Sequence, residues 1–299
     1  MPIVDAHHHL WDLARGYYPL RHGPTRPGPA RDGAGSYLPA HYRHDVRGYD
    51  VVATVHVEAA HDPDDPVAET RWLAEQRRAT AIPTVIVGYA DLRSPLLQDT
   101  LDGHLRHAEV RGIRQMLDVD PLSGGPLRDA LGDDRWVAGL RSVADRGLVF
   151  VAQLDTEELP RLAEVLSGLR DLRVVLCHAG LRGPGALSDR RRWVTGLERL
   201  AACPNVTVAV SGLGSLLPAW DHTLAASVTR TVLDVLGPRR AMFASNFPVD
   251  RPVVTFGQLV AAARTATAHL PVAEQQEFFA GTAQRVYRLP SSVRRPGVV

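Results

Sequence analysis

Three ionisable residues, Asp5, His7 and His9, stand at alternate positions near the N-terminus. Side chains alternate with period two along a β-strand, so an extended segment would place these three on one face and Ala6 and His8 on the other. Two neutral imidazoles that meet at a strand end can bind a divalent metal at roughly 2.0–2.1 Å. We therefore expect a reaction centre on this strand, and a His-rich surface run is the competing interpretation.

Polar side chains also stand at the ends of other short apolar segments. His178 follows one such run, and Asn246 ends the last one, shortly before Asp250. Comparable positions are occupied by Glu58, Arg114, Gln153 and Ser211. Enzymes built on parallel barrels collect their catalytic groups at the C-terminal ends of the strands, so we expect these residues to meet. Cys177 precedes His178 and should point the opposite way, which disfavours a cysteine nucleophile.

The elements that must position these groups are short β-branched runs alternating with helical stretches, as in repeated βα units. The expected strands are residues 2–7, 51–58, 83–90, 110–116, 148–154, 173–178, 206–211 and 241–246. The expected helices are residues 66–80, 95–108, 127–146, 156–168, 190–202, 222–236, 256–269 and 272–287. Eight strands without a glycine-rich phosphate turn favour a closed (β/α)8 TIM barrel over a doubly wound open sheet.

One barrel domain is expected over residues 1–289, followed by a frayed tail at 290–299. The segment 14–45 interrupts the βα pattern with proline, glycine and arginine. A structureless loop of that length is uncommon unless it serves a site, so we expect a lid or pocket wall at the barrel mouth. Trp11 and Tyr18 are then candidate substrate contacts. A loop without function and ordinary core packing of the aromatic rings are the alternatives.

Composition restricts both partners and chemistry. The formal net charge is +1 and the basic residues are dispersed, which favours a small-molecule substrate over nucleic acid or membrane. All 34 basic residues are arginine, so Schiff-base lysine chemistry and a carbamylated lysine bridging two metals are excluded. Two cysteines are too few for a disulfide framework. The N-terminus shows no leader pattern, so a cytoplasmic location is expected, and a homo-oligomer is compatible with the sequence.

The chain resembles the amidohydrolase-2 branch of the amidohydrolase superfamily, which includes sugar-acid and dicarboxylate lactonases. The resemblance spans nearly the whole chain and rests on VDAHHHLWD at 4–12, GIRQ at 112–115, HAG at 178–180, SGLG at 211–214 and SNFPVD at 245–250. It implies that His7 and His9 form a metal pair and that His178 binds metal or polarises the scissile carbonyl. Arg114 and Gln153 would anchor the substrate, and Glu58 is a further candidate substrate-binding residue, although an internal ion pair is the alternative role for Arg114.

Asn246 departs from the family pattern, because the superfamily has an aspartate there that accepts the proton of the attacking water. An amide cannot serve as that base. Three interpretations follow: Asp250, Glu58 or Asp5 is the base; metal activation makes a weak base sufficient; or the site performs no hydrolysis. With Gln153 on the fifth strand and no lysine, we expect at most one divalent ion, zinc in the first place, and a metal-free site is the alternative.

The expected reaction is hydrolysis of a small cyclic ester that bears a carboxylate or hydroxyl groups. Metal or His178 would polarise the carbonyl while a positioned water attacks it. A lyase such as a decarboxylase on the same barrel is the second hypothesis. A barrel that binds a small molecule without catalysis is the third.

Overall fold

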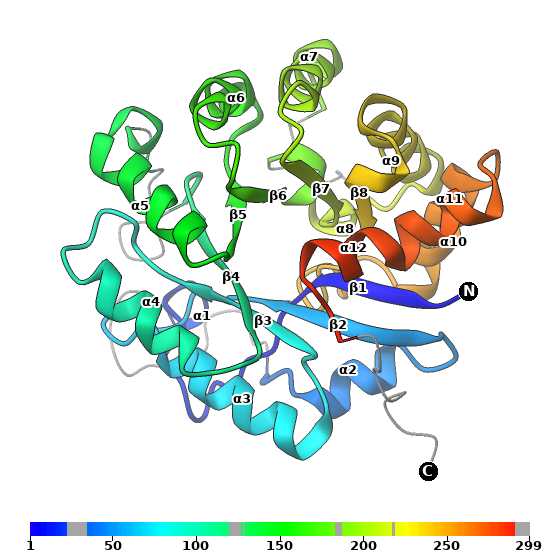
Figure 1. Cartoon of the computed structure of the whole chain (residues 1–299). Coiled ribbons are helices and arrows are strands. Elements are labelled where there is room, and N and C mark those ends of the chain that lie inside the picture. The colour runs from blue at the N-terminus through cyan, green and yellow to red at the C-terminus, as the bar shows by residue number, and fades with distance from the viewer. Residues whose placement is uncertain (23–34, 120–126, 128, 183–186, 217–218, 291–299) are drawn as a thin grey trace.

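The computed structural model describes residues 1–22, 35–119, 127, 129–182, 187–216 and 219–290. Its centre is a sheet of eight parallel strands in chain order that curls into a barrel (Figure 1). The strands are β1 (Ile3–His8), β2 (Val51–Val57), β3 (Val85–Tyr89), β4 (Val110–Met116), β5 (Val149–Gln153), β6 (Arg173–Leu176), β7 (Val206–Val210) and β8 (Ala241–Phe243). The expected barrel is confirmed, although β8 ends at Phe243, three residues before Asn246, whose backbone is left-handed (φ 58°).

Helices follow the strands and form the outer layer. The longer ones are α3 (Ala68–Thr80), α4 (Leu97–Leu105), α5 (Asp134–Asp145), α6 (Leu159–Ser167), α7 (Arg190–Ala201), α9 (His222–Leu236) and α10 (Phe256–Thr267). The short ones are α1 (Pro19–His22), α2 (Pro39–Asp45), α8 (Leu213–Leu216), α11 (Val272–Gln276) and α12 (Thr282–Val286). Single 3-10 turns span Ala130–Gly132, Thr156–Glu158, His178–Gly180 and Pro238–Arg240, and a π turn spans Glu277–Gly281.

Three expected elements differ in the structure. The helix expected over 127–146 begins at Asp134, where the Asp133 side chain accepts the backbone N–H of Arg135 and caps it. The helix expected over 272–287 is divided by the π turn. The structureless segment expected over 14–45 contains α1 and α2, each beginning at a proline, whose fixed φ suits the first turn of a helix. Residues 23–34 of that segment, and the tail beyond residue 290, lie outside the described residues.

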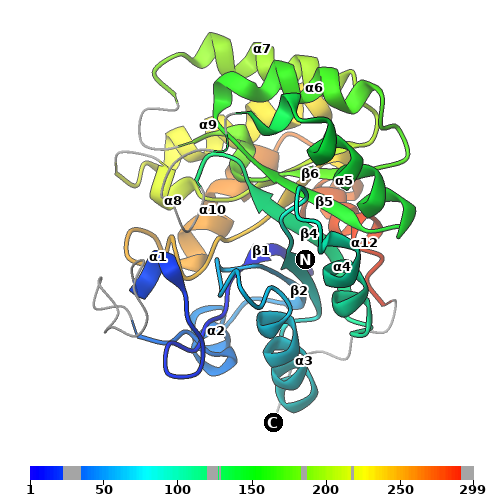
Figure 2. The ribbon, with the colours of Figure 1, turned by 90° about the vertical axis from the view of Figure 1, so that its left-hand side faces the viewer.

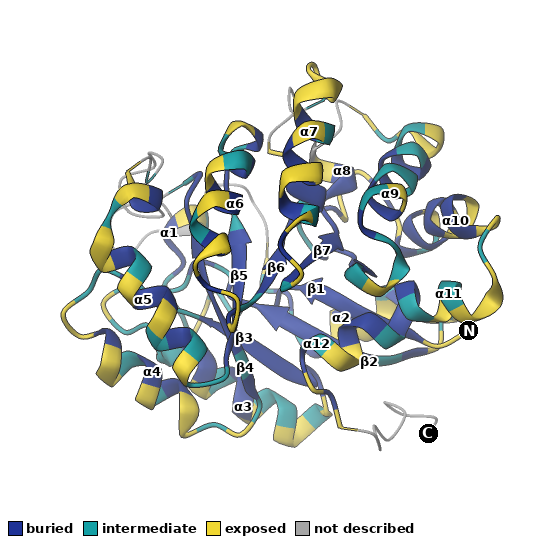
Figure 3. Ribbon diagram, turned by 45° about the horizontal axis from the view of Figure 1, so that its top comes forward, coloured by how far each residue is buried: buried dark blue, intermediate teal, exposed yellow. Residues whose placement is uncertain are grey.

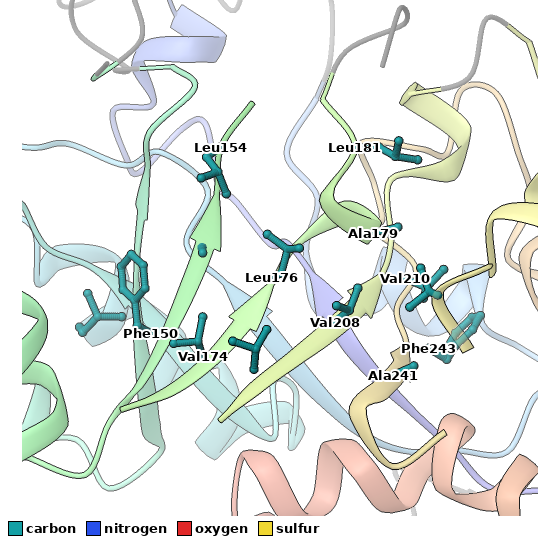
Figure 4. Close-up of a cluster of buried hydrophobic side chains, with 14 of the residues drawn as sticks. Phe150, Leu154, Val174, Leu176, Ala179, Leu181, Val208, Val210, Ala241 and Phe243 are labelled. Carbon is teal, nitrogen blue, oxygen red and sulfur yellow. The ribbon is translucent and has the colours of Figure 1, made fainter. Parts of the chain in front are cut away.

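Two layers of apolar side chains surround the sheet. Small and β-branched residues such as Val55, Val87 and Val151 fill the barrel interior. Tyr287, just after α12, joins this inner cluster, so α12 covers one end of the barrel, while α1 and α8 stand at the other (Figure 2). A second cluster, which includes Phe150 and Leu176, packs between strands and helices (Figure 4).

The strands are buried and the outer helices expose mainly their outward faces (Figure 3). Within the described part of the chain, no helix is long and apolar enough to cross a membrane.

The first and last strands meet at what we call the barrel seam, where β1 faces β8 and the residues that follow it. The backbone N–H of Asn246 donates to the carbonyl of His7 at 2.8 Å, and that of His9 donates to the carbonyl of Phe247 at 2.7 Å. The Asp5 carboxylate adds bonds from the Ser245 backbone N–H (2.8 Å) and hydroxyl (2.6 Å). The seam therefore fixes the end of β1 against the loop that carries Asn246.

Candidate active site

An irregularity in β1 decides which way its side chains point. Asp5 pairs with Thr54 and His8 with His56, so three steps along β1 match two along β2. One extra residue in a strand is a β-bulge, which re-aims the side chains around it and is frequent next to active sites.

Asp5 and His8 consequently point outward to α2. The Tyr42 hydroxyl of that helix donates to Asp5 at 2.8 Å, and its ring lies 4.5 Å from that of His8. His7 and His9 point into the barrel, where their Nε2 atoms are 3.2 Å apart. The expectation that Asp5 shares a face with the two histidines is wrong, because strict alternation holds only for a regular strand.

The tautomer of His9 follows from its partners. Its Nδ1 lies 2.7 Å from the carbonyl oxygen of Val57, which can only accept, so Nδ1 carries the proton. Burial lowers the pKa of both His7 and His9 well below the usual value, which keeps the rings neutral. The Nε2 atom of His9 therefore presents a lone pair, and it faces the Oδ1 atom of Asn246 at 3.3 Å.

Asp250 fixes the orientation of the Asn246 amide. Asn246 donates through Nδ2 to the Asp250 carboxylate at 2.8 Å, which leaves its oxygen directed at His9. The same carboxylate accepts the backbone N–H groups of Gly214 (2.7 Å) and Ser215 (3.2 Å). Burial raises the pKa of Asp250, while these donors lower it. The lone pair of His9 and the amide oxygen thus face each other without a proton between them.

This arrangement fits a single cation. Ligands of a tetrahedral ion at roughly 2.0–2.1 Å lie about 3.3 Å from each other, close to the separations of His9 from His7 and from Asn246. Among the described residues, no group of three or more His, Cys, Asp or Glu side chains could hold a metal, so a cation held between His7 and His9 would take the Asn246 amide oxygen as a further donor.

His178 joins the site from the turn after β6. Its ring centre is 4.9 Å from that of His7, and burial lowers its pKa to about 3. Ser211 holds the ring: its Oγ lies 2.9 Å from Nδ1 and accepts the backbone N–H of His178 at 3.1 Å. The buried Ser211 hydroxyl needs an acceptor for its own proton, and Nδ1 provides one. The proton of the neutral imidazole is then on Nε2.

Cys177 also points inward, with its Sγ 3.5 Å from Nδ1 of His7, so the expectation that it faces away from His178 is wrong. The reason is the left-handed backbone at His178 (φ 55°), which directs the His178 side chain into the mouth. Burial raises the pKa of Cys177 to about 12, so the group beside His7 is a thiol.

Left-handed backbone is concentrated at this mouth. Of the six non-glycine residues with positive φ in the described chain, four are Ala60, His178, Ala179 and Asn246, at 55–58°. Each such residue costs about 1–2 kcal/mol in an L-amino acid, and strain of this kind clusters at functional sites. The conformations of His178 and Asn246 are therefore maintained by the surrounding hydrogen bonds.

A cavity of about 410 Å³ opens above these groups. Six of the residues expected at the site line it: His9, Trp11, Arg114, Gln153, His178 and Asn246. Six do not: Asp5, His7, Glu58, Tyr18, Ser211 and Asp250. Tyr18 is buried, with its ring edge-on to that of His61, because the chain after β1 folds back into the core.

Arg114 occupies the alternative role weighed for it, an internal ion pair. Its Nε donates to the Glu58 carboxylate at 2.6 Å, Nη2 donates to the Glu58 carbonyl, and Nη1 donates to Gln153 at 3.0 Å. Both Glu58 oxygens are engaged, since the second accepts the backbone N–H of Ala60 at 2.7 Å. Glu58, Asp5 and Asp250 therefore all have their carboxylates occupied.

Sequence reasoning missed three charged groups that line the cavity. Asp118 and Arg182 follow β4 and β6 in loops, and Arg21 lies in α1. Arg182 contacts Asp118 at 3.0 Å. The guanidinium carbon of Arg21 lies 4.3 Å from the centre of the Trp11 ring. The sequence signals that could have found two of them are the acidic residue Asp118 just beyond β4 and the basic residue Arg182 beyond β6.

An eight-stranded α/β barrel with histidines just after its first and sixth strands has the arrangement of barrel enzymes, whose catalytic groups stand at the C-terminal ends of the strands. The chain belongs to the amidohydrolase family, whose model matches residues 4–289, and the resemblance found in the sequence is confirmed.

Curated relatives and a solved structure agree with this membership. The chain is 31% identical over 293 residues to the uncharacterized protein y4mH of Sinorhizobium fredii, covering 96% of this chain and 98% of that one. It is 29% identical to an L-fucono-1,5-lactonase of Burkholderia multivorans, covering 96% of each. A crystal structure of an amidohydrolase from Burkholderia multivorans with bound zinc superposes with a TM-score of 0.82 at 25% identity, covering 97% of this chain and 100% of that one.

Proposed function

We propose that this protein hydrolyses a small lactone that bears hydroxyl or carboxylate groups. The observation that carries the proposal is the convergence of His7, His9 and the Asn246 oxygen. His9 and Asn246 line, together with His178, a cavity large enough for one sugar ring. The L-fucono-1,5-lactonase relatives support the same reaction class.

The three converging donors would hold one divalent cation, and imidazole ligands favour zinc. A cation bound there would polarise the scissile carbonyl and lower the pKa of a water toward about 7. The zinc in the similar Burkholderia structure supports this assignment. His7, His9 and Asn246 are supplied as neutral groups, so the ion would keep most of its positive charge for the substrate.

His178 acts on the carbonyl oxygen. With Ser211 donating to Nδ1, the Nε2–H of His178 is directed at the cavity and can donate to the oxygen as it becomes negative. Burial lowers the pKa of His178 to about 3, so the ring does not take up a second proton at neutral pH and acts as a neutral hydrogen-bond donor through Nε2. Asp250 acts through Asn246, whose amide it orients, and is a positioning residue.

The test combines turnover with metal content. Purified untagged protein is assayed against sugar lactones and pyrone carboxylates by acid release, and elemental analysis is expected to give about one zinc per chain. Ser211→Ala should lower kcat by roughly 10-fold to 100-fold with little change in KM, because the donor at His178 is no longer oriented.

Two outcomes would contradict the proposal. Full activity in metal-free protein would remove His7 and His9 from the ligand role. Thermal stabilisation by lactones without any ring opening would reject hydrolysis. Carbon dioxide release from the carboxylated compounds would favour the second candidate, a lyase, which the amide in place of a basic carboxylate at Asn246 makes chemically reasonable.

A further inference from the structure

His178 lies in a turn whose backbone is left-handed over three consecutive residues. His178 and Ala179 both have a φ of 55°, and Gly180 has a φ of 70°. This conformation is unfavourable for histidine and alanine, so such a run persists only where its surroundings fix it. We call residues His178–Gly180 the histidine turn; it follows β6 and lies beside β7 (Figure 4).

Two side chains from outside the barrel hold the carbonyl groups of the histidine turn. The indole Nε1–H of Trp193, in the first turn of α7, donates to the carbonyl of Ala179 at 2.7 Å. The hydroxyl of Thr156, in the 3-10 turn after β5, donates to the carbonyl of Gly180 at 2.9 Å. Ala179 and Gly180 are buried, and a buried carbonyl without a donor is unfavourable. A histidine turn that relaxed to right-handed backbone would redirect these carbonyls and lose both donors.

Close packing brings the indole of Trp193 within reach of the histidine turn. Gly196 follows one turn later in α7, and a Cβ atom added there would stand 2.9 Å from Cβ and Cδ1 of Leu159 in α6. A Cβ atom on Gly180 would meet Leu176 Cδ2 at 2.9 Å and Leu159 Cδ1 at 3.2 Å. The histidine turn and α7 therefore both pack closely on Leu159, which restricts the movement of the turn.

We propose that Trp193 and Thr156 are positioning residues, which keep the Nε2–H of His178 directed at the cavity by fixing the backbone of the histidine turn. Neither residue lines the cavity, so neither would touch the substrate. Their action is separate from that of Ser211, which holds the imidazole ring itself. The inference rests on the proposed function, in which His178 donates to the carbonyl oxygen of a lactone.

Trp193→Phe removes the indole donor and keeps an aromatic ring in its place. For the lactone that the wild-type protein opens fastest, kcat should fall roughly 10-fold to 100-fold with KM within about 2-fold, because a misplaced donor matters most in the transition state. Trp136→Phe is the matched control: Trp136 is equally buried, and its Nε1–H donates to Gln115 at 3.0 Å. It should lose similar stability and keep kcat within about 2-fold of wild type.

Thr156→Val tests the second donor. We expect kcat to fall roughly 3-fold to 10-fold, whereas Thr267→Val, which removes a buried hydroxyl that donates to Ala263 at 2.9 Å, should leave kcat unchanged. In the double variant with Trp193→Phe, kcat should fall by less than the product of the two single effects, because either loss releases the same turn. Effects that multiply would contradict this shared action.

A measurement without substrate tests the backbone of the histidine turn directly. The backbone N–H of Leu181 donates to the carbonyl of His178 at 2.8 Å and closes the turn. Hydrogen–deuterium exchange at Leu181 should be roughly 10-fold faster in Trp193→Phe and unchanged in Trp136→Phe, because only the first variant opens this turn locally. Both variants are compared at the same interval below their unfolding temperatures.

The outcomes separate this inference from the function on which it rests. Equal losses of kcat in Trp193→Phe and Trp136→Phe would reduce Trp193 to a packing role and overturn the inference, while the lactonase function stands. If the wild-type protein opens no lactone, the function fails and exchange at Leu181 decides. Faster exchange in Trp193→Phe alone supports the positioning of the turn, and any other pattern rejects it.

Discussion

Asp5 is a motif carboxylate that the structure places outside the barrel, and replacing it by asparagine distinguishes a structural role from a catalytic one. Burial raises the pKa of Asp5 from 3.8 to about 6, although the Ser245 backbone N–H and the Ser245 and Tyr42 hydroxyls donate to it and lower that pKa. A shift of about two units corresponds to roughly 3 kcal/mol. Asparagine keeps an oxygen for the Ser245 backbone N–H and has no charge to bury.

The raised pKa of Asp5 determines how the stability of the protein changes with pH. The folded protein binds the Asp5 proton more tightly than the unfolded chain, so the stabilisation that this proton gives is fully present below about pH 4 and is lost as the pH rises through about 6. The free energy of unfolding of Asp5→Asn, relative to that of the wild type, should therefore increase by about 1.5 kcal/mol from pH 5 to pH 8, which is half of the roughly 3 kcal/mol that the whole pKa shift represents. Urea denaturation at both pH values measures this difference.

Tyr42→Phe serves as the matched control. Removing the hydroxyl that donates to Asp5 should raise the pKa of the carboxyl further, so the loss of stability toward pH 8 should become larger. For Asp5→Asn, kcat should stay within a few-fold of wild type, since Asp5 does not line the cavity. A pH-independent stability difference, or a fall in kcat of about 100-fold or more with the fold intact, would refute this reasoning.

Two further predictions concern the proposed cation site, and both are read out as zinc affinity by competition with a chelator. Asn246→Asp places a carboxylate opposite His9 and should tighten zinc binding about 10-fold; unchanged affinity would exclude the position-246 oxygen as a ligand. Cys177→Val removes the partner of Nδ1 in His7 and should weaken binding about 10-fold, whereas Cys177→Ser should retain it; equal loss in both variants would point to packing instead.

The barrel could be predicted because its strands are continuous apolar runs separated by helical patterns, and such runs depend on local sequence alone. The direction of the Asp5 side chain could not be predicted from the sequence. The bulge is defined by the register of β1 against β2, a relation between segments some fifty residues apart. The same limit applies to Cys177, whose direction depends on the left-handed turn at His178.

The sequence predicted which residues lie at the candidate site better than it predicted which of them pair with one another. Strand-end reasoning located His9, Arg114, Gln153, His178 and Asn246, which all line the cavity. It could not show that Glu58 neutralises Arg114, because an ion pair and a substrate anchor have the same sequence pattern. Asp118 and Arg182 were missed because they lie in loops beyond the strands, where no periodic pattern marks a side chain's direction.

The barrel seam also ties the site to the completion of folding. His9 comes from the beginning of the chain and Asn246 from near its end, and the backbone bonds of the seam bring them together. A ligand shared by these two residues binds only chains in which the last strand has docked against the first. Its binding free energy would then add to the stability of the closed barrel, joining the two ends of the polypeptide without a covalent link.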